Sequence, residues 1–216
     1  MSLYGIFKNK DNKTLVYYPV PKNANSSAKY FLAKHCGVDK NFKKVIDLND
    51  PNSKIENDDV QSEKTKPAIS SFLPSKQKFA VTDADIKACI IREPIDRFIS
   101  AYTNRVLFRK DQGFFEHSID MVIEKLRQGR FENKHFLPQT YFLGKNINYF
   151  NLICCMDSLK IFEDAVNQFF KNKIIFPWIE TKSSKLKLSK KQRFDLKEIY
   201  ADDEIFFSDY KKLINN

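Results

Sequence analysis

The stretch LVYYPVPKNANSS, residues 15–27, joins a short apolar run to a loop of small polar residues that contains one lysine. A helical pattern follows, with Ala28, Phe31 and Leu32 on one face, and it ends at Gly37. In a strand–loop–helix unit, the loop N–H groups and the helix N-terminus favour an anion at one spot, and Lys22 adds a full positive charge. By itself the stretch fits an ordinary connection equally well, because Asn and Ser are common loop and N-cap residues.

Length and composition predict a globular protein with an anionic partner. The chain has 216 residues, 42% of them hydrophobic and 20 of them Phe, which is enough for the core of one sizeable domain. Its 37 Lys and Arg against 27 Asp and Glu give a net charge of +10. Such a charge favours nucleic acid, a nucleotide, a polyanionic sugar or an acidic membrane surface without choosing among them. Most of these lysines are expected to form a solvated surface.

The four cysteines indicate a reducing compartment. They form no CxxC pair and no ligand set with the three histidines, so no metal is expected. Cys89, Cys154 and Cys155 lie in apolar runs, where a reduced cysteine packs as a small hydrophobic residue. The N-terminus lacks a signal-peptide pattern, and no apolar run in the sequence approaches the length of a membrane span. A soluble, cytoplasmic protein is therefore expected.

Strand and helix patterns alternate along the chain. Residues 3–7 and 14–20 predict an N-terminal hairpin, and residues 86–91 and 149–156 predict strands at the centre of a sheet. Helical periodicity, with a capping box before the segment at 190–199, is found at residues 95–106, 115–126, 159–169, 190–199 and 205–206. This alternation predicts an α/β fold with a mostly parallel sheet, whose ligands bind at the carboxyl ends of the strands.

The segment between the first helix and residue 86 has a different composition. Short strands are predicted at 44–48 and 78–82, and the polar stretch at about 49–77 is predicted to be a mobile loop. It is not a domain boundary, because each side alone is too small for a good core. The whole chain, 1–216, is therefore expected to form one domain.

A second motif, IIREPIDRFISAY, covers residues 90–102. Arg92 leaves the end of a buried strand, Pro94 fits the first turn of the next helix, and Ser100 lies two turns further on, away from the apolar stripe. A guanidinium and a hydroxyl so placed can hold one phosphate. Taken alone, an arginine that caps sheet carbonyls and a surface serine account better for the pattern.

Together the two motifs resemble the sulfotransferases that use 3′-phosphoadenosine 5′-phosphosulfate (PAPS), most of all the carbohydrate group with chondroitin-type and HNK-1-type enzymes and bacterial relatives. In that family a Pro-Lys-x-x-x-Ser/Thr loop holds the 5′-phosphosulfate, and an Arg-Asp/Glu-Pro-x-x-Arg-φ-x-Ser-Ala-Tyr run holds the 3′-phosphate. Residues 21–27 and 92–102 are similar to these motifs, and residues 135–139 and 188–207 resemble further family segments. The resemblance covers about residues 16–207 and implies a three-layer, P-loop-like α/β fold with helices on both sides of the sheet.

The resemblance also implies the ligands and the residues that bind them. The donor would be PAPS, the product 3′,5′-ADP (PAP), and the acceptor a hydroxyl, expected on a glycan, with no nucleic acid partner. Lys22 would be catalytic, at the bridging or leaving oxygens of the sulfuryl group. The residues implied in donor binding are Pro21, Lys22, Asn23, Ala24, Asn25, Ser26, Ser27, Arg92 and Ser100. The basic loop at 181–187 has Thr181-Lys182-Ser183-Ser184 where relatives often carry Asn-x-Ser, so no contact to the nucleotide is assigned to it.

The acceptor hydroxyl needs a general base. His135, in the segment HFLPQ that resembles the family, is the candidate catalytic base. A lone His near aromatic residues is more often a packed structural residue, so Glu56 and Glu63 of the polar segment stay open as alternatives. His35 fits the inner face of the first helix, and His117 is expected to be exposed.

Two other classes of protein were weighed against this interpretation. A P-loop kinase or NTPase requires a glycine loop that ends in Gly-Lys-Ser/Thr, and the sequence contains no such string. A basic module that binds polyanions without catalysis is compatible with the net charge, but the sequence carries no nucleic-acid-binding signature. Its aromatic residues fall at core spacing and are not interleaved with a basic patch.

Overall fold

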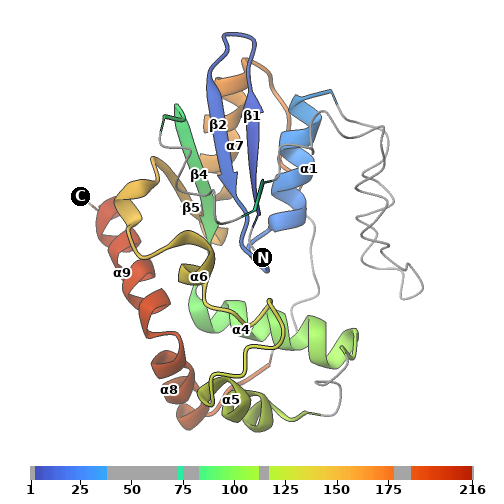
Figure 1. Ribbon diagram of the computed structural model, residues 1–216, viewed down its shortest axis with the longest axis vertical. Helices are drawn as coiled ribbons and strands as arrows, with labels where there is room; N and C mark the ends of the chain where they lie inside the picture. The colour runs from blue at the N-terminus through green and yellow to red at the C-terminus, as the bar shows by residue number, and fades with distance from the viewer. Residues whose placement is uncertain (1–2, 38–72, 75–82, 112–116, 178–185, 216) are drawn as a thin grey trace. The chain divides into compact units, whose positions relative to one another are not determined.

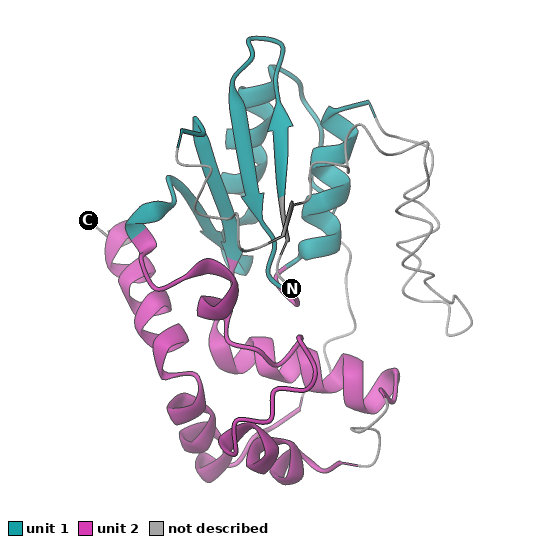
Figure 2. Cartoon of the chain, viewed as in Figure 1, with its two compact units in different colours: residues 1–20, 24–90, 148–181 teal, residues 21–23, 91–147, 182–216 magenta. Residues whose placement is uncertain are grey.

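Five strands form one sheet in the order β3-β1-β2-β4-β5 (Figure 1). The computed structural model describes residues 3–37, 73–74, 83–111, 117–177 and 186–215. The strands are β1 (Leu3–Lys8), β2 (Thr14–Tyr18), β3 (Leu73–Pro74), β4 (Ile86–Ile91) and β5 (Leu152–Cys155). The chain divides into two compact units, coloured separately in Figure 2: residues 1–20, 24–90 and 148–181 form unit 1, and residues 21–23, 91–147 and 182–216 form unit 2.

The sheet confirms the predicted α/β class, with a central sheet flanked by helices. β1 pairs antiparallel with β2 as the expected N-terminal hairpin, and it also pairs antiparallel with β3. β2 and β4 run parallel, with Tyr17 opposite Ala88. Residues on both faces of these two strands are buried, including Tyr17 and Val16 on β2 and Ala88 and Cys89 on β4. Burial on both faces is what the apolar density of β4 predicted.

The central position predicted for the strand at 149–156 was wrong. β5 stands at the end of the strand order, beyond β4, among the strands that the structure describes. Its burial alternates along the strand, with Leu152 and Cys154 buried and Ile153 and Cys155 half-buried. The apolar run therefore reflects packing of one face against the core, and continuous hydrophobicity did not identify the neighbours on both edges.

Two helices of unit 1, α1 (Asn25–His35) and α7 (Leu159–Phe170), contribute to the same hydrophobic core as the sheet. Phe31 of α1 and Phe162 of α7 are fully buried, with ring centroids 6.2 Å apart, and Tyr17 of β2 lies 5.7 Å from Phe162. Gly37 follows α1 with a left-handed φ of +79°, which agrees with the predicted end of this helix. The short 3₁₀ turns Ile147–Tyr149 and Met156–Ser158 flank β5.

Unit 2 is helical. It contains α4 (Pro94–Tyr102), a π-helix (Thr103–Phe108), α5 (Ile119–Arg127), α6 (Gln139–Leu143), α8 (Lys190–Ile199) and α9 (Ala201–Asn215). The stripe predicted on α4 is buried, with Ile95 and Phe98 in a core that also holds Phe136. The predicted capping box before α8 is confirmed, because Ser189 Oγ accepts from the N–H of Gln192 and the Gln192 side chain accepts from the N–H of Ser189.

Several predictions lie outside the described residues: the strands at 44–48 and 78–82, most of the polar segment at 49–77 with Glu56 and Glu63, and most of the basic loop at 181–187. In the part of the chain that is described, no helix combines the length and the apolar character that crossing a membrane requires. The same part contains no group of three or more His, Cys, Asp or Glu side chains placed to hold a metal ion.

Candidate functional site

The loop after β2 places Lys22 in an unusual backbone conformation. Lys22 has a φ of 73° and Ala24 a φ of 50°, both in the left-handed region that residues other than glycine seldom adopt. Each such residue costs on the order of 1 kcal/mol and persists where surrounding contacts impose it, often at functional sites. Asn23 between them is fully buried. The loop is therefore held in one shape by its contacts.

The side chain of Gln139 contacts both sequence motifs, the lysine loop at Asn23 and the second motif at Arg92. Its Oε1 accepts from Nδ2 of Asn23 at 2.6 Å and from the N–H of Arg92 at 3.0 Å. Its Nε2 donates to the carbonyl of Arg92 at 2.7 Å. One buried side chain thus holds the residue after Lys22 and the main chain of Arg92 together. The structure therefore brings the lysine loop and Arg92 together.

Two arginines of the second motif also bind the loop. Arg92 Nη1 donates to the carbonyl of Lys22 at 3.3 Å, and Arg97 Nε donates to the carbonyl of Pro21 at 3.0 Å. Arg97 is 1% exposed, and its Nη2 has no hydrogen-bond partner among the described residues. A buried, incompletely satisfied guanidinium is costly for the folded protein.

Positive charges surround the Lys22 ammonium. Burial first, and then the charges of Arg105, Arg92, Arg109 and Arg97 in that order, lower the pKa of Lys22 to about 7. Cations gathered around one partly buried ammonium favour its neutral form until an anion arrives. The arrangement has the electrostatic character of an anion site.

The ring of His135 lies against Arg105. Arg105 Nη2 is in hydrogen-bond contact with Nε2 of His135. Burial, followed by the charges of Arg105, Lys22 and others, lowers the pKa of His135 to about 2. His135 is therefore neutral at physiological pH and sits beside the same cationic group as Lys22.

Comparison with known proteins adds one decisive observation. The model of the sulfotransferase family matches residues 6–211, nearly the whole chain. The chain belongs to the sulfotransferase family. No curated protein and no solved structure gives a significant match. Membership supports sulfuryl transfer in general terms, as the two motifs led us to expect.

The remaining residues predicted to bind the donor of this sulfotransferase lie at the start of α1 and in α4. Ala24 precedes α1, and residues 25–27 form its first turn, in unit 1. Their main-chain N–H groups precede the first full turn of the helix, so they have no intrahelical acceptor. Ser26 is exposed and Ser27 is buried. Ser100 is half-buried in α4, eight residues after Arg92.

Three residues of this sulfotransferase that shape the site were not predicted: Arg97, Arg105 and Gln139. Arg97 and Gln139 belong to the segments that resemble the family, but their burial and partners could not be read from spacing. Arg105 lies in the π-helix that continues α4, where the widened turn departs from the predicted 3.6-residue period. The sequence offered one signal for Arg105: it is a basic residue that closely follows the second motif, residues 90–102.

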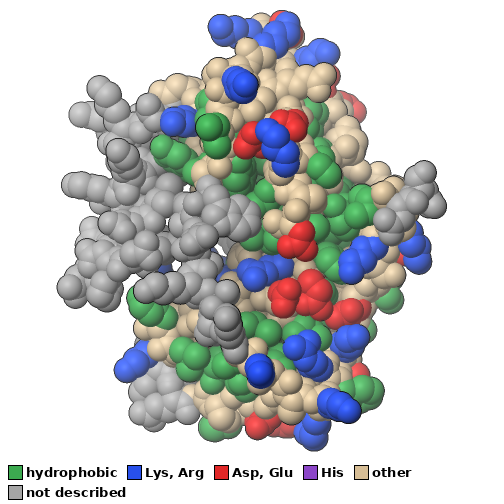
Figure 3. All heavy atoms as spheres, turned by 180° about the vertical axis from the view of Figure 1, so that it is seen from behind, with side chains coloured by type: hydrophobic (Ala, Val, Ile, Leu, Met, Phe, Trp, Pro, Cys, Tyr) green, Lys and Arg blue, Asp and Glu red, His purple; other side chains and the backbone are tan. Residues whose placement is uncertain are grey.

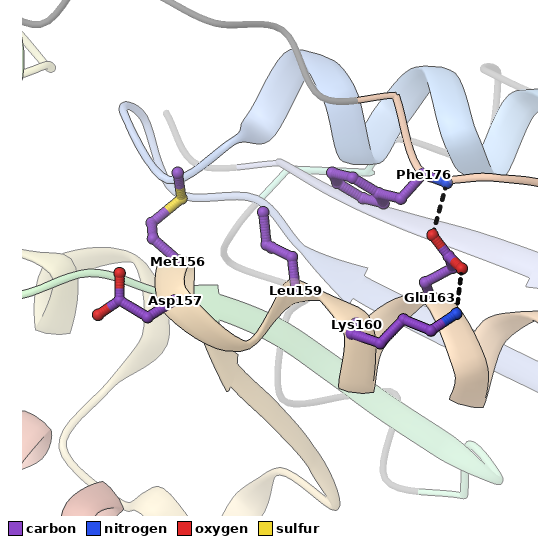
Figure 4. Close-up of a pocket in the computed structure, with 6 residues that line it drawn as sticks. All are labelled: Met156, Asp157, Leu159, Lys160, Glu163 and Phe176. Atoms are coloured by element: carbon purple, nitrogen blue, oxygen red, sulfur yellow. Dashed lines mark hydrogen bonds and ion pairs between the residues drawn. The ribbon is translucent and has the colours of Figure 1, made fainter.

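Unit 1 of the sulfotransferase contains a pocket of about 410 Å³ (Figure 4). Met156, Leu159 and Phe176 give it an apolar lining, and Asp157 lies at one end. Its other charged groups are already paired, because Glu163 accepts from Lys160 Nζ at 2.5 Å and from the N–H of Phe176 at 2.8 Å. The pocket therefore offers apolar contact and one carboxylate, a different chemistry from the cations around Lys22.

Surface charge is dispersed on the face drawn in Figure 3. Lys and Arg side chains are scattered there among Asp and Glu side chains. Ion pairs such as Lys145–Asp202 at 2.7 Å and Lys160–Asp164 at 2.8 Å show the same mixing within each unit. Around Lys22, by contrast, the largest charge effects all come from cations: Arg105, Arg92, Arg109 and Arg97.

Proposed function

We propose that this protein transfers the sulfuryl group of PAPS to a hydroxyl group of a carbohydrate acceptor and releases 3′,5′-ADP. The observation that carries the proposal is the cluster of cations at the lysine loop, where Arg92 and Arg97 donate to the carbonyls of Lys22 and Pro21. Positive charges so close together repel one another and, with burial, lower the pKa of Lys22 to about 7. A ligand with several negative charges relieves this mutual repulsion, and PAPS has such charges at its 5′-phosphosulfate and its 3′-phosphate. Family membership narrows the chemistry to sulfuryl transfer.

The residues present fit such a donor. Lys22, the N–H groups of the loop and those of the first turn of α1 would hold the 5′-phosphosulfate, with Ser26 and Ser27 as hydroxyl donors. Arg92 and Ser100 would hold the 3′-phosphate, the arginine in a bidentate contact. The incompletely satisfied guanidinium of Arg97 is consistent with a site that is complete when an anion is bound.

When bound, the donor supplies an activated sulfuryl group, and the protein must align the acceptor and neutralise the leaving phosphate. Lys22 in its charged form would neutralise the leaving oxygen. The proton of the acceptor hydroxyl must pass to a base, and His135 is our candidate because it lies beside the cationic group. Its imidazole is neutral, as a base must be, and the negative charge of a bound donor would raise its lowered pKa toward the range that proton transfer needs.

Two further proposals concern the setting of this activity. We propose a cytoplasmic location, because the four cysteines are free, and Cys89 and Cys154 are buried as reduced residues. We also propose that residues 1–216 work as one domain, because the family model extends across both compact units.

The test is a comparison of two nucleotides that differ in where the second phosphate is attached. Isothermal calorimetry should show that 3′,5′-ADP binds at least about tenfold more tightly than 5′-ADP, a difference of about 1.4 kcal/mol. Lys22→Ala should abolish sulfuryl transfer from PAPS to a panel of glycans, whereas Lys10→Ala in the β1–β2 turn should not. Equal affinity for the two nucleotides, or transfer by Lys22→Ala at the wild-type rate, contradicts the proposal.

A further inference from the structure

The contact between Arg105 and His135 is held from both sides. Arg105 Nη1 lies 3.6 Å from Asp111 Oδ2, and this carboxylate also accepts from Asn133 Nδ2 at 2.7 Å. Asn133 Oδ1 accepts from the main-chain N–H of His135 at 3.0 Å. Asn133 and Asp111 therefore connect the backbone of His135 to the guanidinium that contacts its ring. Such a closed network orients both side chains.

The position of Arg105 depends on the π-helix. α4 ends at Tyr102, and the widened turns of Thr103–Phe108 follow directly. Because a π-helical turn holds more residues than an α-helical turn, it changes the side of the helix on which Arg105 lies. Such turns are often found at functional sites. The Arg105 side chain is 18% exposed, so its contact with His135 is shielded from most of the solvent.

The chemistry of the two groups fixes where the imidazole proton resides. A guanidinium has N–H donors and no acceptor, so Nε2 of His135 must accept in this contact. A neutral imidazole carries one proton, which must then be on Nδ1. Nδ1 is buried and has no hydrogen-bond partner among the described residues. It is therefore a donor without an acceptor.

The surroundings of His135 oppose its protonation. Among the described residues, the largest charge effects on it come from four cations, Arg105 of the π-helix, Lys22 of the loop, Lys134 of its own segment and Arg97 of α4, while the Asp111 carboxylate faces Arg105 and Asn133. Together with burial, the four cations favour the neutral ring. Because both its charge state and its contacts are set, a single tautomer is expected.

We infer that Arg105 is a positioning residue that holds His135 as the neutral Nδ1–H tautomer in the ligand-free protein. In this state Nε2 is occupied by the contact with Arg105, and the Nδ1–H group is left to donate to a ligand or water. The consequence for catalysis rests on the proposed function: His135 can take a proton on Nε2 only after Arg105 leaves that nitrogen. An anion bound beside Lys22 is the kind of group that competes for a guanidinium.

The test is an NMR measurement of the histidine tautomers in the full chain without ligand. The chain has three histidines, so ¹⁵N-imidazole labelling gives few signals, and the His135→Asn variant assigns those of His135. We expect His135 to show a protonated Nδ1 and an unprotonated Nε2, with no titration between about pH 5 and 8, where an unperturbed histidine titrates. A wild-type His135 with its proton on Nε2, or one that titrates in this range, overturns the inference.

Variants distinguish the effect of the Arg105–His135 contact on the tautomer from the effect of the surrounding positive charge. Arg105→Met should move the His135 proton to Nε2 in a large fraction of molecules and raise its pKa, whereas Arg109→Met should leave the tautomer unchanged. Arg105→Leu, which also removes the donor, is the second variant if Arg105→Met does not fold. Unchanged His35 and His117 signals would show that a variant is folded. An unaltered His135 spectrum in a folded Arg105 variant contradicts the inference. Calorimetry with 3′,5′-ADP tests the proposed function separately, because the tautomer is measured without ligand.

Discussion

The carboxylate of Asp203, in the first turn of α9, caps the start of α6 at Gln139. Asp203 Oδ2 accepts from the main-chain N–H of Gln139 at 2.6 Å, and Oδ1 accepts from the N–H and the hydroxyl of Thr140, both at 2.8 Å. The Gln139 side chain in turn binds Asn23 and the main chain of Arg92. A C-terminal helix therefore supports the loop that carries Lys22.

Removal of the Asp203 carboxylate should destabilise the protein strongly. Asp203 is 1% exposed and accepts three hydrogen bonds, so Asp203→Ala should lower the free energy of unfolding by about 3 kcal/mol. The neighbouring Asp202→Ala is the matched control, since its exposed ion pair with Lys145 contributes less than about 1 kcal/mol. Urea unfolding of both variants measures the difference. Equal stability of the two would mean that the cap contributes little.

The side chain of Gln139 should be needed for anion binding. Gln139→Met removes the contacts to Asn23 and Arg92, so the lysine loop loses its fixed position relative to the arginine. We expect the Kd for 3′,5′-ADP to rise at least about tenfold. Gln128→Met, at the exposed end of α5, should leave the Kd unchanged. A folded Gln139→Met protein with wild-type affinity would show that the two motifs do not depend on this bridge.

The sequence predicted the parts of the site that are local in the chain. Lys22 and Arg92 each follow a buried strand, and the parallel pairing of β2 with β4 brings these strand ends together. This juxtaposition was predictable because residue order and strand direction determine it. Family resemblance then indicated which anion to expect.

The features that the sequence did not reveal depend on contacts between residues that are far apart in the chain, or on local departures from a regular helix. Gln139 stood in a recognised segment, but its link to Asn23 joins residues 116 positions apart. Arg105 was missed because the pattern predicted a regular helix through Val106, whereas the structure widens into a π-helix after Tyr102. Periodicity records burial and not hydrogen-bond geometry, so neither feature could be read from it.

The core of unit 1 should depend on Phe162. This residue is fully buried on α7, and its ring packs against those of Tyr17, Phe31 and Phe176 at centroid distances of 5.7, 6.2 and 6.0 Å. Phe162→Ala should cost about 3–5 kcal/mol of unfolding free energy, because it removes the contacts and leaves a cavity. Ile161→Ala, whose side chain is 49% exposed on the same helix, should cost much less. Thermal unfolding that ranks the two variants the other way contradicts this assignment of the core.

The lowered pKa of Lys22 predicts that anion binding takes up a proton. With a pKa of about 7, Lys22 is mostly neutral at about pH 8, and a bound phosphate or sulfate favours its charged form. Binding of 3′,5′-ADP at that pH should therefore take up nearly one proton, measured by calorimetry in two buffers of different ionisation enthalpy. At about pH 6 the amine is already charged, so its uptake should disappear, and affinity should fall as the pH rises above 7.

The Lys22→Met variant identifies the residue responsible. It should bind 3′,5′-ADP more weakly at about pH 6, and its binding at about pH 8 should lack the proton uptake of the wild type. The phosphate groups of the ligand titrate near pH 6 and are fully ionised at pH 8, so they do not imitate the effect there. The lowered pKa of Lys22 also makes the stability of the folded protein depend on pH. Between about pH 7 and 10 the unfolded chain holds the Lys22 proton and the folded chain does not, so the contribution of Lys22 to stability increases with pH. Proton uptake that persists in Lys22→Met would assign the linkage to another group.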